Sequence, residues 1–138
     1  MIMVPDASIP IVQMSLNSNL SAKDHINIGL AIQSLRDDDI MIVGSGFSFH
    51  NFKYIFGDAD LKKIGKEHSK IFDDWLKSAL VSDDRKSQME NWETGCPSSY
   101  ECHPPGKTEH LLPLHVVFGA SGCAKGKNFH NPMSFGFY

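Results

Sequence analysis

The apolar positions at the start of the chain predict two strands with one helix between them. The stretch "IPIVQMSL" (9–16) mixes β-branched and apolar residues over the length of a strand, and "IMIVGSG" (40–46) begins as an unbroken apolar run of the kind that strands covered on both faces show. Between them, apolar residues recur at helical spacing (Ile28, Ala31, Ile32 and Leu35). That spacing predicts an amphipathic helix over roughly 22–36. The order is that of a β-α-β unit.

The second half of the chain predicts mainly helix. Apolar residues at helical spacing (Phe72, Trp75, Leu76, Ala79 and Leu80) indicate an amphipathic helix over roughly 66–81, and the polar segment 82–92 is expected to continue as helix. Residues 93–107 are rich in Gly, Pro and Ser and predict a loop. A further helix is expected to begin near Thr108 and to stop at Gly119 or Gly122. The tail 131–138 is expected to add an edge strand.

Length and charge narrow the class of protein. The chain has 138 residues and a formal net charge of −3, so we expect a single domain over 1–138 and no binding of nucleic acid or an anionic membrane. No apolar run reaches the length of a membrane span, and the N-terminus has neither a basic region nor a signal-length apolar core. Cys96, Cys102 and Cys123 are odd in number without a CxxC spacing, so we expect inert, reduced thiols and a cytoplasmic protein.

His50 is the first candidate site residue. It follows the predicted strand 40–46, and ligands in open α/β sheets bind beyond the carboxyl ends of the strands. Gly44 and Gly46 lack the third glycine of a dinucleotide fingerprint, so a nucleotide site is not favoured. His110 and His115 are five residues apart, a spacing that excludes the HExxH zinc pairing, which needs i and i+4.

Three motifs, in order, carry a resemblance to a known family. "VPDASIPIVQMSLN", "GSGFSFHN" and "HPPGKTEHLLPLHVVFGASG" resemble the C-terminal half of the class III extradiol ring-cleavage dioxygenases, in the DOPA dioxygenase-like branch. The resemblance implies an α/β fold with a central mixed sheet and flanking helices. It also implies a mononuclear non-haem site for Fe(II), sometimes occupied by Zn(II), that cleaves a catechol beside the diol with O₂.

The resemblance assigns roles to three histidines. His50 matches the family histidine that faces metal and substrate, so it is the candidate catalytic acid and base and an additional metal contact. His110 matches the C-terminal metal ligand, and His103 matches a histidine close to the pocket that supports the site without binding metal. Neutral imidazole binds Fe(II) well and can exchange a proton near neutral pH. The remaining histidines are expected in packing or surface roles, and Phe47 and Phe49 in the core or a pocket wall.

The resemblance implies two further histidine ligands in an N-terminal half. Three accounts of its absence here are open: a truncated gene product, a degenerate relative that no longer catalyses, or a separate N-terminal chain. We therefore expect an extradiol catechol dioxygenase-like protein whose single metal site is incomplete and which is inactive alone. Its expected partners are a small aromatic diol and either a second copy or a complementary chain. The alternative is a non-catalytic binding or scaffolding module derived from this family. A metal-dependent hydrolase, which would turn over without O₂, is a third possibility.

Overall fold

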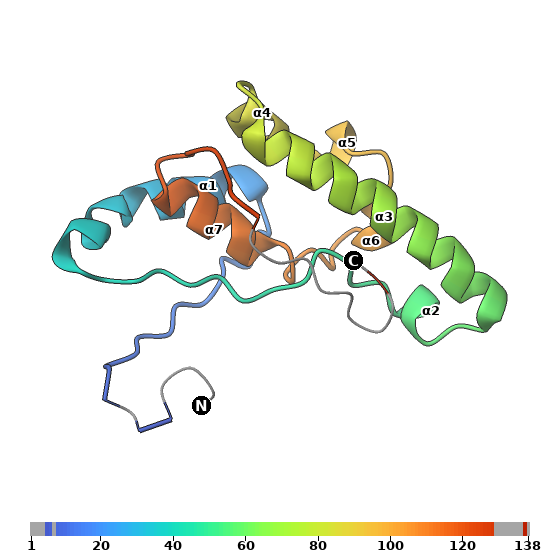
Figure 1. Cartoon of the computed structure of the whole chain (residues 1–138), viewed down its shortest axis with the longest axis horizontal. Helices are drawn as coiled ribbons and strands as arrows, with labels where there is room; N and C mark the ends of the chain where they lie inside the picture. Colours follow the sequence, from blue (N-terminus) through green and yellow to red (C-terminus); the bar gives the residue numbers. More distant parts are fainter. Residues whose placement is uncertain (1–4, 7, 129–136, 138) are drawn as a thin grey trace.

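The computed structural model describes residues 5–6, 8–128 and 137. Figure 1 shows a long helix, α3, in one half of the molecule, with short helices close to it, and the pair α1 and α7 in the other half. The elements in chain order are α1 (Ala22–Ala31), the 3₁₀ helix η1 (Gln33–Asp38), α2 (Phe52–Ile55), α3 (Ala59–Val81), α4 (Arg85–Glu90), α5 (Trp92–Gly95), α6 (Ser99–Cys102) and α7 (Leu112–Ala120).

The predicted central mixed sheet is wrong. Helix accounts for 53% of the described residues and strand for 1%, and no sheet is present among them. Residues 8–16 and 41–46 are extended, but within the described ranges they make no backbone–backbone hydrogen bond. Runs of β-branched and apolar residues favour an extended backbone locally. A β-strand also requires a neighbouring strand with which it can form hydrogen bonds. Within the described residues, neither segment is paired with another strand.

The predicted helices are present, with shifted ends. The helix expected over 22–36 is α1 followed by η1, and the one expected over 66–81 is the longer α3. The polar segment forms α4 and α5, while the loop expected over 93–107 also contains the short helix α6. The edge strand expected over 131–138 lies outside the described residues except for Phe137, which stacks on Phe49 with ring centroids 4.5 Å apart.

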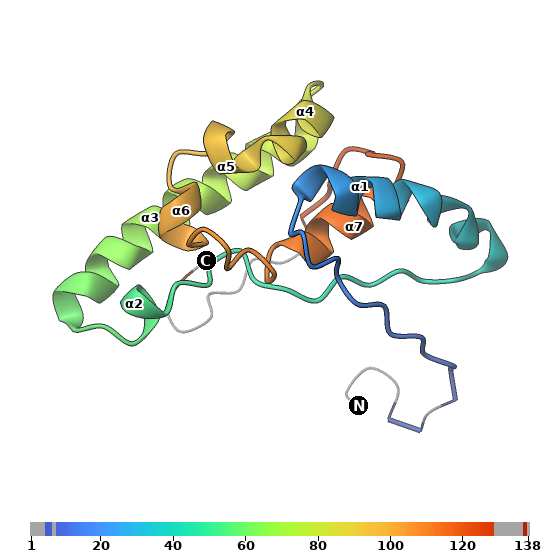
Figure 2. The same cartoon turned by 180° about the vertical axis from the view of Figure 1, so that it is seen from behind.

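Helices α1 and α7 lie side by side in both views (Figures 1 and 2), and glycine makes their contact possible. A Cβ atom built on Gly29 would lie 2.0 Å from the carbonyl oxygen of Val116. A Cβ atom on Gly119 would lie 2.1 Å from the carbonyl oxygen of Ile26. Real atoms do not approach so closely, so only glycine allows the two backbones to meet here.

The core beneath the long helix is aromatic. Phe72 of α3 and Trp92 of α5 are buried and meet edge to face, with ring centroids 6.0 Å apart. The ring of His103 lies 5.4 Å from the ring of Phe72 and 5.6 Å from that of Trp92. Such edge-to-face contacts are favourable beyond the apolar area they bury. This cluster fixes α6 and the following turn against α3.

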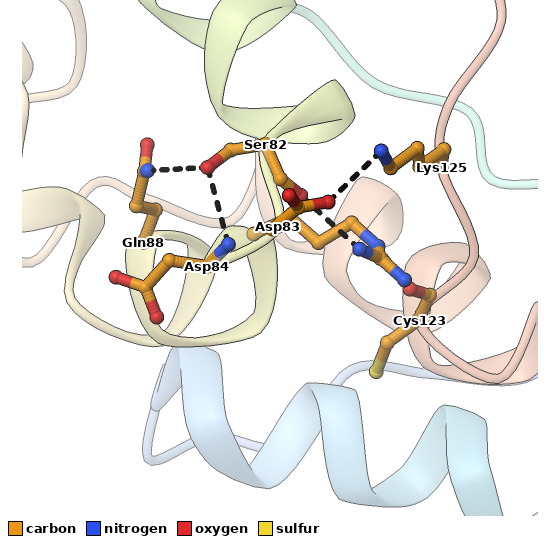
Figure 3. A network of polar contacts seen from close by, with 7 residues as sticks. Ser82, Asp83, Asp84, Gln88, Cys123 and Lys125 are labelled. Carbon is orange, nitrogen blue, oxygen red and sulfur yellow. Dashed lines mark hydrogen bonds and ion pairs between the residues drawn. The ribbon is translucent and has the colours of Figure 1, made fainter.

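A polar network joins the turn between α3 and α4 to the segment after α7 (Figure 3). The Arg85 guanidinium donates from Nε to the carbonyl oxygen of Cys123 and from Nη1 to that of Ser82. Lys125 and Asp83 form an ion pair of 2.9 Å across the same junction. These contacts hold the segment after α7 against the C-terminal end of α3.

Within the described residues, no helix combines the length and apolar character needed to cross a membrane.

Candidate functional site

Residues 47–51 form a segment without regular secondary structure that is hydrogen-bonded to two distant parts of the chain. The amide of Phe47 donates to the carbonyl oxygen of His110 at 2.9 Å, and the amide of His50 donates to that of Cys102 at 3.0 Å. The side-chain amide of Asn51 donates to the carbonyl oxygen of Glu101 at 2.8 Å. These bonds fix the position of His50 between α6 and the residues before α7.

The two glycines before this segment allow a close approach to the start of α7. A Cβ atom on Gly46 would lie 2.1 Å from the carbonyl oxygen of His110, and one on Gly44 would lie 2.6 Å from that of Pro113. No larger residue fits this spacing. The two glycines therefore allow the backbone of 44–46 to pack closely against the start of α7.

His50 and His110 lie directly against each other. Their ring centroids are 3.5 Å apart and the ring planes differ by 31°. His110 lies two residues before α7, with 36% of its side chain exposed, and its Nε2 atom is 3.9 Å from the Glu109 carboxylate. Two histidines that the sequence singled out, 60 residues apart, thus meet at the surface of the protein.

The environment of His50 keeps its imidazole neutral. Burial lowers the pKa of His50, the neighbouring His110 lowers it further, and Glu109 offsets part of this effect. Since an unperturbed histidine titrates near 6.5, a lower pKa leaves the ring uncharged at neutral pH. A neutral imidazole has one nitrogen lone pair with which it can accept a proton.

His103 is completely buried. Its Nε2 atom is 2.9 Å from the carbonyl oxygen of Ser48. Because a carbonyl only accepts, this nitrogen carries the proton, and Nδ1 is left without a hydrogen-bond partner. Burial lowers the pKa of His103 to about 4. His103 thus holds the backbone two residues before His50 while its own ring packs in the aromatic core.

The arrangement does not fit a mononuclear iron or zinc centre. Such sites usually take at least three protein ligands, as in the two-histidine, one-carboxylate iron site. No group of three or more His, Cys, Asp or Glu side chains in the described part of the chain is placed to hold a metal ion. His50 and His110, whose ring planes are tilted by 31°, supply two imidazole donors, fewer than the three that such a site usually needs.

The sequence reasoning missed two features beside the pair. The first is Phe52, whose ring lies 4.6 Å from that of His50 and is 58% exposed; its place two residues after His50 was the available signal. The second is the hydrogen bond from the Tyr54 hydroxyl to the Glu101 carboxylate. That bond, with burial, raises the pKa of Tyr54 to about 12.

A cavity of about 440 Å³ lies away from the pair. It contains none of the three predicted site histidines, and its lining combines the loop before α1, the first turn of α1 and parts of the 90–108 region (Ser18, Asn19, Leu20, Ser21, Ala22, Lys23, Glu90, Glu93, Gly106 and Thr108).

Comparison with known proteins gives one family. The family model described as "Catalytic LigB subunit of aromatic ring-opening dioxygenase" matches residues 1–136. No solved structure matches the chain.

Three relatives illustrate the similarity. The chain is 33% identical over 144 residues to a 4,5-DOPA dioxygenase extradiol of Beta vulgaris, covering 100% of this chain and 52% of that protein. It is 36% identical over 123 residues to the protein of the same name from Mirabilis jalapa, covering 88% of this chain and 43% of that protein. It is 33% identical over 129 residues to dioxygenase tasH of Hapsidospora irregularis, covering 85% and 38%. The chain therefore spans about half, or less, of the length of these relatives.

Proposed function

Because the chain belongs to the family of the catalytic LigB subunit of aromatic ring-opening dioxygenases, we propose that it takes part in the extradiol cleavage of a catechol. Its resemblance to the C-terminal half of such dioxygenases fits the share of each relative that it covers. The observation that carries the proposal is the contact between His50 and His110, whose rings lie 3.5 Å apart. These two side chains are this chain's contribution to the reaction centre.

His50 is the group that moves protons in this proposal. Its lowered pKa leaves the imidazole neutral at neutral pH, so a ring nitrogen can take the proton of a catechol hydroxyl and return it to the opened product. A positioned acid or base of this kind contributes about 10²- to 10⁴-fold in rate. His103 keeps His50 in place through its bond to the carbonyl of Ser48.

Dioxygenases of this family generally use a non-haem metal, which supplies the binding of the diol and of O₂. Fe(II) or Zn(II) are the candidates, and His110 is the candidate ligand with His50 as a further contact. Since two imidazoles alone do not form such a centre, we infer that further donors come from outside residues 1–138, on the same polypeptide, a second copy or a complementary chain. The described chain alone is then inactive.

The alternative function is a non-catalytic binding or scaffolding module derived from the same family. The observation that favours it is the incomplete donor set among the described residues. A module of this kind would retain the fold and the histidine pair, but it would not gain turnover when further donors are supplied. Turnover is therefore the measurement that separates the two functions.

The test is a chimera that joins this chain to the part of the Beta vulgaris relative that it does not cover. We expect O₂ uptake and catechol cleavage by the chimera and none by the chain alone. His50→Ala and His110→Ala in the chimera should each abolish cleavage, whereas the matched control His68→Ala, on α3, should retain it. Wild-type turnover by the His110→Ala chimera would contradict the proposal, and so would cleavage by the chain alone.

Self-association has its own test. If a second copy supplies the donors, light scattering should show a dimer or larger species. A monomer over a wide range of protein concentration would leave the same polypeptide or a complementary chain.

A cytoplasmic location is also part of the proposal. Cys96, Cys102 and Cys123 are free and buried, and burial raises the pKa of the Cys96 thiol to about 12. Free, protonated thiols suit a reducing compartment.

A further inference from the structure

Three phenylalanine rings lie exposed around the histidine pair. Phe47, Phe52 and Phe56 are 49%, 58% and 73% exposed, respectively. We call these three residues, together with His50 and His110, the aromatic face. Exposed apolar side chains gathered in one place usually mark a binding surface.

The rings of the aromatic face form a connected set. The ring centroid of Phe47 lies 6.4 Å from that of His50 and 6.2 Å from that of His110. Phe52 lies 4.6 Å from His50, and Phe56 lies 5.4 Å from Phe52. Phe47 therefore contacts both histidines and Phe52 contacts His50, while Phe56 contacts only Phe52 in this set.

The backbone holds these rings outward. Phe49 and Asn51, on either side of His50 in the sequence, are buried, whereas Phe47 and Phe52 are exposed. The bond from the Phe47 amide to the carbonyl oxygen of His110 fixes the backbone at Phe47. The Asn51 side chain caps α2 by accepting from the amide of Lys53. This cap fixes Phe52 at the first position of the helix, beside His50.

The chemistry of the face selects one class of ligand. Aromatic rings attract another ring through offset or edge-to-face contacts at centroid distances of about 4.5–7 Å. The two imidazoles at the centre offer nitrogen atoms that can bond hydroxyl groups. A planar aromatic ring with adjacent hydroxyls satisfies both, whereas an aliphatic diol satisfies only the second.

We propose that Phe47 and Phe52 are specificity-determining residues that hold the aromatic ring of the diol beside His50 and His110. The assignment rests on the proposed function, because it concerns the same site, but it requires only binding. It predicts that ring recognition takes place in this chain even without metal and without turnover.

The test is ligand-observed saturation-transfer NMR on the full 138-residue chain, kept with a chelator and without O₂. The probes are catechol and cis-1,2-cyclohexanediol, which has the same adjacent hydroxyls but no aromatic ring. We expect catechol to bind and cyclohexanediol to bind at least several-fold more weakly. Equal binding of the two probes, or no transfer to catechol, would overturn the proposal.

Variants locate the binding on the face. Phe52→Leu and Phe47→Leu should each weaken catechol binding by about 2- to 12-fold, the range for an aromatic pair. Phe52→Tyr, which keeps the ring, should stay near the wild-type affinity. Tyr100→Leu is the matched control, since Tyr100 is 49% exposed and lies on α6. An unchanged affinity in both leucine variants, or an equal loss in the control, would overturn the assignment.

The outcome is distinct from that of the chimera. Catechol binding without turnover in the chimera would contradict the catalytic role and leave the ring site intact. Turnover in a chimera with Phe52→Leu and Phe47→Leu at unchanged KM would contradict the ring site and leave the catalytic role intact. A face that instead packs against an apolar polypeptide would bind neither probe.

Discussion

Acid should unfold the protein through histidines that are buried in their neutral form, and His115 provides the sharpest test. His115 lies in α7 and is completely buried. Its Nε2 atom is 3.1 Å from the carbonyl oxygen of Met89, and its Nδ1 atom is 3.4 Å from that of Leu111. Burial lowers the pKa of His115 from its ordinary value of 6.5 to about 4.

The sign and size of the effect follow from this pKa. The folded state binds the proton more weakly than the unfolded state, so the contribution to stability is present above pH 6.5 and is lost as pH falls toward 4. Between about pH 7 and about pH 4.5, one such group removes about 2 kcal/mol from the free energy of unfolding. His103, whose pKa is also lowered to about 4 by burial, should remove a similar amount.

The perturbation is His115→Gln, which keeps a donor for the Met89 carbonyl but does not titrate. Urea unfolding followed by circular dichroism at both pH values gives the free energy of unfolding of each protein. The wild type should lose about 2 kcal/mol more than the variant over this range. If the two proteins lose the same free energy, His115 is not buried in its neutral form.

Three further changes test the packing and the polar contacts by urea unfolding. Gly119→Ala should cost about 1–3 kcal/mol, because the new methyl group would meet the carbonyl oxygen of Ile26; an unchanged midpoint would contradict the close contact between α1 and α7. Tyr54→Phe should cost about 1.5–3 kcal/mol near neutral pH, and since the pKa of Tyr54 is raised to about 12, the difference from wild type should disappear as pH rises from 10 through 12. A difference that persists above that range would contradict the hydrogen bond to Glu101. Arg85→Ala should remove the two hydrogen bonds from the guanidinium to carbonyl oxygens and lower the free energy of unfolding by about 1.5–3 kcal/mol. An unchanged free energy of unfolding would show that other contacts hold the segment after α7.

The helices could be predicted from the sequence because their signals are local. Ser21 caps α1 with its side chain, and Asp58 does the same for α3. The apolar residues that predicted the second helix include Phe72 and Leu76, which are buried. Periodicity and capping depend only on residues within a few positions, so no knowledge of the rest of the fold is needed.

The strands could not be predicted correctly, because pairing is not a local property. The predicted strands contain apolar residues that are 47–93% exposed (Ile9, Val12, Ile40, Met41 and Val43). The apolar pattern cannot state whether a partner strand is present. The second predicted strand does pack against another element, but that element is the start of α7, and Gly44 and Gly46 allow the close contact.

The site residues stay a prediction, and the geometry that brings two of them together could not be predicted from the sequence. The motifs identified His50 and His110, and the structure brings their rings together. The loop over 93–107 gave no sign that His103 is completely buried, because burial there depends on rings from α3 and α5. The contact between the two imidazoles likewise accompanies the bond from the Phe47 amide to the His110 carbonyl, which sequence spacing does not predict.

We propose that this chain supplies two histidines to a metal-dependent centre that needs further donors. The most direct measurement is an anaerobic Fe(II) titration of the purified chain by calorimetry. We expect no tight binding by the chain alone and about one Fe(II) per chimera, with binding by the chimera weakened in His110→Ala. One tightly bound Fe(II) per monomeric chain would contradict the account, because it would show that the described histidines and their neighbours already form a complete site.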